Sequence, residues 1–169
     1  MSSTAAEHKA QAPVSVRCAV ITVSDTRTVE TDTGGQILAD RLMSAGHSIV
    51  QRCITPDEPD SMRATLQQLS ERSDVDAVLL TGGTGITRRD QTYETVGSLL
   101  TKPLPGYGEL FRLLSYQEIG SAAMLSRAVG GLMDRTVVLT MPGSPAAVRL
   151  AMDRVILPEL GHLVREAQR

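Results

Sequence analysis

The stretch that does most to define the fold is "DAVLLTGGTGITRRD", residues 76–90, in which a mostly apolar run leads directly into a glycine-rich turn. The run 76–81 is short, mostly apolar and followed by turn residues. This pattern is typical of a strand buried on both faces of a sheet. The remainder leaves two alternatives open. It is either a phosphate cradle followed by a functional carboxylate, Asp90, or a tight turn followed by a helix cap.

Apolar runs on both sides of this stretch predict an alternation of strands and helices. Further strands are predicted at 18–23, 47–54 and 136–141. Helical spacing of apolar residues predicts helices that carry Leu38, Leu42 and Ala45 up to Gly46; Met62, Leu66 and Leu69; residues 92–100 and 107–119; Val148, Ala151 and Val155 before Pro158; and Leu160, Leu163 and Val164. The order strand–helix–strand–helix–strand indicates one doubly wound α/β domain with a mostly parallel sheet.

Composition and charge exclude several classes of protein. The 169 residues include three Tyr, one Phe and no Trp, and the net charge is −2, which together argue against a nucleic-acid partner. The chain contains no apolar stretch of the ~18 residues that a membrane span needs. Residues 1–14 lack the apolar core of a signal peptide. We therefore expect a disordered tail over 1–14, a single domain over 15–169, no membrane partner and a cytoplasmic location.

Four polar or glycine-rich loops follow predicted strands, at residues 23–27, 55–59, 81–90 and 141–145. If the strands are parallel, all four loops leave the sheet at the same edge, where ligands bind in open α/β sheets. Their convergence predicts the site more strongly than any single loop does.

The glycine turn itself fits either alternative. Gly82, Gly83 and Gly85 lack Cβ atoms, so their backbone N–H groups can approach an anion closely, and Thr84 adds a hydroxyl donor. The spacing matches neither a Walker A loop nor the dinucleotide-binding G-x-G-x-x-G pattern. The residues alone therefore favour neither a phosphate site nor a purely structural turn.

Two aspartates carry the same ambiguity. Asp90 could be the N-cap of a helix beginning near Gln91, and Asp57 could cap the helix that Pro59 opens. Carboxylates are also the ligands that Mg²⁺ uses beside substrate phosphates. Two of them on neighbouring strand ends, next to a glycine turn, are compatible with a metal–phosphate site.

The loop "MPGSP" (141–145) repeats this logic. Ser144 is suited to N-cap a helix with Pro145 at its first position, whereas Gly143 leaves room for a ligand. Ser24 and Asp25 end the first strand in a similar way, with a weaker signal.

Three segments resemble a known family. "LLTGGTGITRRD", "PGYGELFRLLSYQEIGSAAMLSRAVGG" and "TVVLTMPGSPAAV" are similar to the glycine signature, the Ser-Arg segment and the Pro-Gly-Ser loop of the MoaB/Mog molybdenum cofactor biosynthesis proteins. The resemblance covers roughly residues 15–165 and is nearest to the MoaB branch. It implies a three-layer α/β molybdopterin-binding fold that assembles as homotrimers or hexamers.

The resemblance also implies an activity and its residues. Active members of the family transfer AMP from Mg·ATP to the terminal phosphate of molybdopterin; an alternative is an accessory protein that binds molybdopterin without significant catalysis. By resemblance, Asp57 and Asp90 are the catalytic and Mg²⁺-binding carboxylates. Gly82, Gly83, Thr84 and Gly85 form the nucleotide or phosphate loop, and Ser24, Asp25, Pro142, Gly143 and Ser144 contact substrate. The roles of Ser126 and Arg127 stay open: the two residues either face the pterin or start a hairpin.

Overall fold

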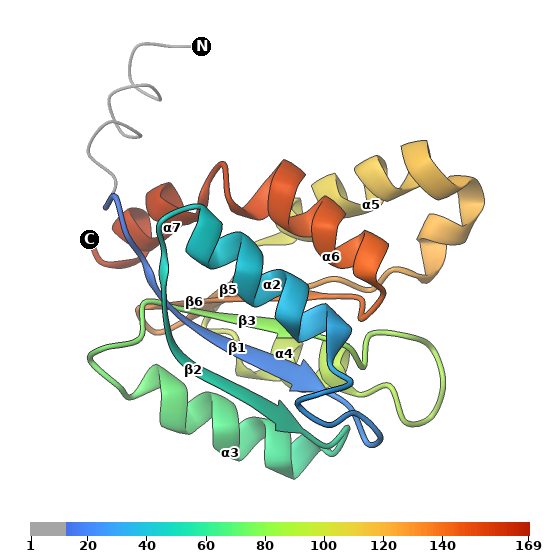
Figure 1. The fold of residues 1–169 in the computed structure, drawn as a ribbon, viewed down its shortest axis with the longest axis horizontal. Helices are drawn as coiled ribbons and strands as arrows, with labels where there is room; N and C mark the ends of the chain where they lie inside the picture. Colours follow the sequence, from blue (N-terminus) through green and yellow to red (C-terminus); the bar gives the residue numbers. More distant parts are fainter. Residues whose placement is uncertain (1–12) are drawn as a thin grey trace.

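The computed structural model describes residues 13–169, so the predicted tail (1–14) lies almost entirely outside the described residues. Within 13–169 the chain forms one sheet of six strands in the order β2–β1–β3–β6–β5–β4 (Figure 1). The four strands β2 (Ser48–Thr55), β1 (Arg17–Val23), β3 (Ala77–Thr81) and β6 (Thr136–Met141) are parallel, whereas β5 (Gly130–Met133) is antiparallel to both of its neighbours, β6 and β4 (Lys102–Pro103). The prediction of a mostly parallel α/β sheet is confirmed.

Helices cover both faces of this sheet and complete three layers. Figure 1 shows α2 (Thr33–Ser44), α5 (Pro105–Ile119), α6 (Pro145–Ala151) and α7 (Leu160–Ala167) on one face. The other face carries α3 (Pro59–Ser70) and α4 (Thr92–Leu99). A 3₁₀ helix, η1 (Gly120–Leu125), extends α5, and a π-helical turn, η2 (Met152–Ile156), extends α6. None of the helices in the described part of the chain is long and apolar enough to span a membrane.

The central strands are mostly apolar because alternate residues enter two different cores. In β1, Cys18 and Val20 pack with Leu38 and Leu42 of α2, whereas Ala19 and Ile21 face the core of α3 on the other side. Side chains of a strand alternate between the two faces of its sheet, so a strand covered on both faces needs apolar residues at every position.

Several boundaries differ from the predictions. Ala45 is the exposed C-cap of α2 rather than part of its buried face, and Gly46 follows it with φ +86°, the conformation expected where a helix ends at glycine. Strands β4 and β5 differ from the expectation, since no strand was predicted at either position. These strands have only two and four residues, and β5 begins with two glycines, so neither has the apolar alternation that identifies a strand.

Candidate active site at the carboxyl edge of the sheet

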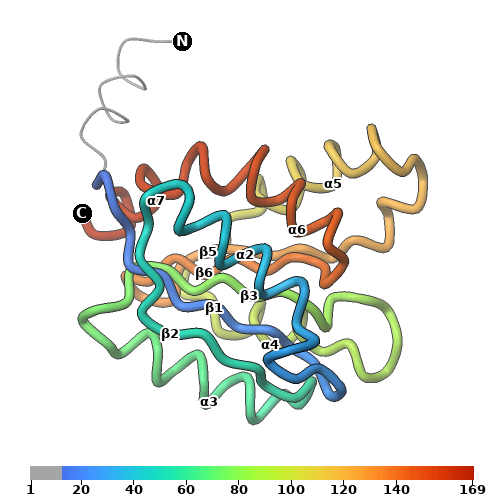
Figure 2. The backbone as a smooth tube through the Cα atoms, viewed as in Figure 1, coloured from blue at the N-terminus to red at the C-terminus, as the bar shows by residue number. Residues whose placement is uncertain are grey.

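The four parallel strands end level with one another. Val23 of β1 lies opposite Thr55 of β2, and Thr81 of β3 lies opposite both Thr22 of β1 and Met141 of β6. The loops that follow them therefore emerge at one edge, and the tube in Figure 2 shows the blue loop after β1 and the green loop after β3 at the same end of the sheet. The sequence-predicted site residues are brought together there.

The glycine positions of the turn after β3 have no room for side chains. Gly82 has φ +101°, and a Cβ there would lie 2.3 Å from the carbonyl oxygen of Val23. Gly83 has φ +63°, and its Cβ would lie 2.3 Å from Thr92 Oγ1 and 2.7 Å from Asp57 Oδ2. Gly85 does not have a positive φ, but a Cβ there would meet Asp90 Oδ2 at 2.7 Å. The turn thus brings backbone, rather than side chains, against both candidate carboxylates.

Asp90 does not cap the helix that follows it. Helix α4 has Gln91 at its N-cap position, and Asp90 instead turns back, accepting hydrogen bonds at Oδ2 from Thr87 N (2.9 Å) and Thr87 Oγ1 (2.6 Å). These bonds from Thr87 outweigh partial burial and hold the pKa of Asp90 below its ordinary value. The carboxylate is therefore ionised at neutral pH and fixed at the mouth of the turn.

Asp57 does not cap its own helix either. Glu58 occupies the N-cap position of α3, and Asp57 Oδ1 accepts from the backbone N–H of Gln91 at 3.1 Å. Only 7% of Asp57 is exposed. Burial raises the pKa of this carboxyl, the bond from Gln91 opposes the rise, and the negative charges of Asp90 and Asp25 add to it.

Repulsion between these carboxylates is compatible with a divalent cation. Within residues 13–169 no three His, Cys, Asp or Glu side chains cluster closely enough to form a metal site by themselves. Mg²⁺ in nucleotide sites is commonly held by one or two protein carboxylates, with substrate phosphates completing the shell. Asp57 and Asp90 fit a metal of that kind, which would arrive with its substrate.

Arg89 ties three of the edge loops together. Its guanidinium donates to Asp25 Oδ2 from Nε (3.1 Å) and Nη2 (2.8 Å), and to Glu58 Oε1 from Nη1 (2.5 Å). Asp25 in turn accepts the backbone N–H of Asp57 at its other oxygen, 3.0 Å away. Asp25, predicted to contact substrate, is thus engaged in holding the loops.

Arg127, whose role the sequence left open, holds the glycine loop from the other side. Its guanidinium donates to the carbonyl oxygens of Thr84 (3.1 Å), Gly85 and Asp90 (3.1 Å). It also pairs with Glu94 and lies 5.3 Å from the centre of the Tyr93 ring. Its neighbour Ser126 lines a cavity, described next.

Two cavities meet at the glycine turn. The larger, of about 370 Å³, is called here the α5 cavity. It is lined by Gly82, Gly83, Thr84, Gly85, Asp90, Phe111, Ser115, Ile119, Ala122, Leu125, Ser126, Pro142, Gly143, Ser144 and Ala147. The α2 cavity, of about 240 Å³, is lined by Thr22, Val23, Ser24, Arg27, Asp32, Thr33, Gly34, Thr81, Gly82, Gly143 and Pro145. Gly82 and Gly143 border both cavities.

Ser144 and Ser24 reach these cavities in different ways. Ser144 is the N-cap of α6, as predicted, because its Oγ accepts the Ala147 N–H at 3.2 Å, and it also lines the α5 cavity. Ser24 lines the α2 cavity, and its Oγ accepts N–H groups of the turn that follows it. Both serines therefore have a structural role as well as a place at a cavity.

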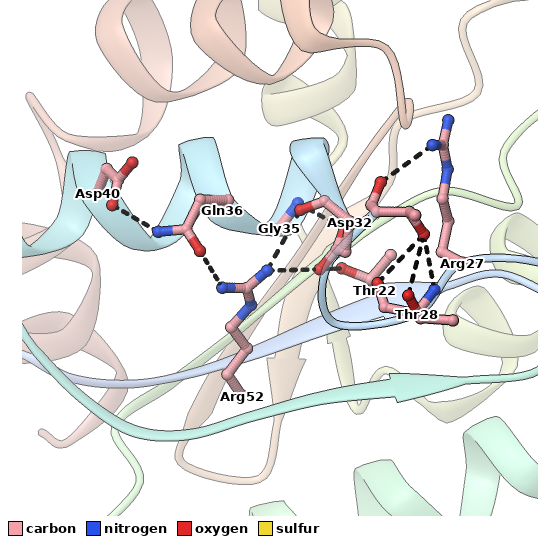
Figure 3. Close-up of polar contacts among 9 residues, drawn as sticks. Thr22, Arg27, Thr28, Asp32, Gly35, Gln36, Asp40 and Arg52 are labelled. Carbon is pink, nitrogen blue, oxygen red and sulfur yellow. Dashed lines mark hydrogen bonds and ion pairs between the residues drawn. The ribbon is translucent and has the colours of Figure 1, made fainter.

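One wall of the α2 cavity is built by Asp32, a residue that the sequence analysis did not assign (Figure 3). The buried carboxylate accepts from Gly35 N, Thr22 Oγ1 and Arg52 Nη2, each at 2.9 Å. Burial alone would raise the pKa of Asp32, but these three partners outweigh it and the pKa is lowered. An aspartate three residues before an N–H of the first helical turn is an N-cap pattern, so the sequence did hold this signal.

A third cavity, of about 380 Å³, lies at the opposite, amino end of the strands. Its three arginines are already engaged: Arg17 pairs with Asp76, Arg72 pairs with Asp74, and Arg135 donates to the carbonyl oxygen of Gln168. It contains none of the predicted site residues, so the carboxyl edge remains the better candidate for chemistry.

Comparison with known proteins gives a consistent result. The model of the "Probable molybdopterin binding domain" family matches residues 19–162. The chain is 54% identical over 164 residues to Molybdenum cofactor biosynthesis protein B of Bacillus anthracis, covering 96% of this chain and 97% of that protein. A crystal structure of a Molybdenum cofactor biosynthesis protein B superposes with TM-score 0.91 at 54% identity, covering 94% of this chain and 99% of the other. The tungsten cofactor synthesizing protein MoaB from Pyrococcus furiosus superposes with TM-score 0.82 at 36% identity, covering 94% and 100%.

Proposed function

The chain belongs to the molybdopterin-binding domain family of molybdenum cofactor biosynthesis proteins, and on that premise we propose that it is a cytoplasmic molybdopterin adenylyltransferase. In this reaction an oxygen of the terminal phosphate of molybdopterin attacks the α-phosphorus of ATP. The bond from that phosphorus to the oxygen bridging the α- and β-phosphates breaks, and pyrophosphate leaves. The products are adenylylated molybdopterin and pyrophosphate.

The observation that carries the proposal is the pair of cavities. A two-substrate transfer needs two binding spaces that meet where the bond is exchanged, and the α5 and α2 cavities share Gly82 and Gly143. Asp90 borders the α5 cavity. Asp57 Oδ1 accepts a hydrogen bond from the N–H of Gln91, the residue that follows Asp90. This arrangement supports a reaction between two bound molecules better than it supports one ligand in one pocket.

The side chains present suit phosphate chemistry without a covalent enzyme intermediate. The attacking phosphate is already anionic near neutral pH, so the protein's task is to align two negatively charged groups and lower their repulsion. The glycine turn lets substrate phosphates approach the backbone closely, and Asp57 and Asp90 would position the groups around it. Mg²⁺ entering with the nucleotide would be held by Asp57, Asp90 and phosphate oxygens, and would offset charge on the phosphates.

The direct test uses the wild-type protein with molybdopterin, ATP and Mg²⁺. We expect release of pyrophosphate that depends on molybdopterin, together with adenylylated molybdopterin detected by mass spectrometry. Molybdopterin binding without any pyrophosphate above the rate of a sample lacking the pterin would reject the transferase. It would leave an accessory molybdopterin-binding protein as the function.

We also propose that the chain forms a homo-oligomer, a trimer or a hexamer, through the outer face of α5 and η1. This surface exposes Leu110, Leu113, Tyr116, Ile119, Met124 and Leu125, each between 51% and 76% exposed. Exposed apolar side chains gathered on one segment commonly mark an interface. Two of its members, Ile119 and Leu125, also line the α5 cavity, so an interface here would border the site.

Light scattering coupled to gel filtration at micromolar concentration should give three or six times the mass of one chain. Leu113→Glu should shift the protein toward monomer, because a carboxylate would be buried at the interface. Val14→Glu, at an apolar residue of 93% exposure elsewhere, should leave the mass unchanged. A wild-type monomer would exclude this assembly.

A further inference from the structure

The peptide unit that joins Asp90 to Gln91 is held at both of its polar atoms. Its carbonyl oxygen accepts from Arg127 Nη2 at 3.1 Å, and its N–H donates to Asp57 Oδ1, also at 3.1 Å. A peptide unit is planar and rigid, so these two bonds leave it little freedom to rotate. The backbone of Asp90 is therefore bound to Asp57 at the N–H of this peptide and to Arg127 at its carbonyl oxygen.

The same guanidinium also holds the beginning of the loop. It donates to the carbonyl oxygens of Thr84 and Gly85, so one side chain bridges residues five or six positions apart along the loop. Thr92 N closes the same loop by donating to Gly83 O at 3.0 Å. Because Arg127 binds the carbonyl oxygens of Thr84 and Gly85, the N–H groups of the same two planar peptide units, those of Gly85 and Ile86, are directed away from it.

We propose that Arg127 is a positioning residue for the reaction: by binding three carbonyl oxygens of the 84–90 loop, it sets where the Asp90 carboxylate stands relative to Asp57 and to the glycine turn. Arg127 acts through the backbone and does not line either of the two cavities. The kinetic part of this inference rests on the proposed function, whereas the structural part does not.

The chemistry of the contacts explains why arginine is needed. A guanidinium carries five N–H donors in a planar fork, which allows it to reach three carbonyls and a carboxylate at once, whereas an ammonium is a compact point charge. The pairing with Glu94 is less important, because the Glu94 side chain is 53% exposed and an exposed ion pair contributes little. The side chain of Arg127 itself is only 23% exposed.

The test compares Arg127→Met and Arg127→Lys with the control Glu94→Gln, which removes the ion pair but leaves the carbonyl contacts. Hydrogen exchange of the amides in 83–91 should be at least ~10-fold faster in Arg127→Met, since the loop loses its anchor. The kcat for adenylyl transfer should fall at least ~10²-fold while KM for ATP stays within about 3-fold, because misplacement of about 1 Å has that effect. Arg127→Lys should fall between, and Glu94→Gln should match wild type within about 2-fold.

The proposal is overturned if Arg127→Met folds and its amides in 83–91 exchange at the wild-type rate. It is also overturned if the kcat of Arg127→Met equals that of wild type. Glu94→Gln behaving like Arg127→Met would also overturn it, because the ion pair would then be the anchor. If Arg127→Met does not fold, the kcat and exchange of Arg127→Lys decide by the same criteria. If the wild type forms no adenylylated molybdopterin, the proposed function fails, and the exchange measurement alone still supports or overturns the role of Arg127.

Discussion

Replacing Asp90 with asparagine should leave the protein folded and able to bind molybdopterin and ATP, but should slow adenylyl transfer at least ~10²-fold, the size expected when a preorganised electrostatic group is lost. The substitution keeps an oxygen that can accept from Thr87 N, so the loop geometry is largely preserved. The substitution removes the negative charge of a carboxylate whose pKa is lowered by the hydrogen bonds from Thr87. It also removes a carboxylate oxygen that is suited to bind Mg²⁺. The measurement is single-turnover formation of adenylylated molybdopterin beside equilibrium binding of both substrates.

Asp60→Asn is a matched control for this variant. It removes the same charge from a fully exposed position in the first turn of α3, where Asp60 pairs with Arg63. Its turnover should equal that of wild type. If Asp90→Asn turns over at the wild-type rate, Asp90 has no catalytic role. If wild type and variant both show only the background rate, the protein is better described as a molybdopterin-binding protein.

Substituting alanine for Gly82 should destabilise the fold by about 2–4 kcal/mol, because it combines backbone strain with a steric clash. The φ of +101° lies outside the conformations open to residues with a side chain, and the new Cβ would sit 2.3 Å from the carbonyl oxygen of Val23. Thermal unfolding should show a melting temperature lower by about 5–15 °C. Transfer activity should fall as well, since Gly82 borders both cavities.

Gly97→Ala provides the contrast. An added Cβ there meets nothing within 4 Å, and the residue lies inside α4, so alanine should raise stability by about 0.5–1 kcal/mol. A melting temperature for Gly82→Ala equal to that of wild type would show that the turn can adopt a different backbone conformation, and would remove the argument that glycine is required.

The sequence predicted the parallel part of the sheet because β1, β3 and β6 are mostly apolar runs, each followed by a polar loop. From that pattern the convergence of Asp57, the glycine turn and Ser144 at one edge followed directly. The antiparallel strands β4 and β5 could not be found in this way. Their pairing depends on tertiary contacts, such as the close approach of Gly131 to β4, where a Cβ would lie 2.3 Å from the carbonyl oxygen of Lys102.

Local rules also gave wrong partners for the two aspartates. Asp57 and Asp90 both precede a helix, and the N-cap interpretation is reasonable for either. In the structure, Asp57 instead accepts an N–H 34 residues further along the chain, and Asp90 accepts from Thr87. The contacts of Arg127 likewise join segments 37–43 residues apart, a separation at which sequence spacing carries no information on contact.

The border between the α5 and α2 cavities has a consequence for how close two bound molecules can come. At Gly82 and Gly143 the partition consists of main chain alone, and a Cβ on Gly143 would already lie 3.3 Å from the Cα of Gly82. Such a wall is as thin as a polypeptide can make it. A side chain at either position would thicken it, and under the proposed reaction each added carbon would increase the distance between the terminal phosphate of molybdopterin and the α-phosphorus of ATP.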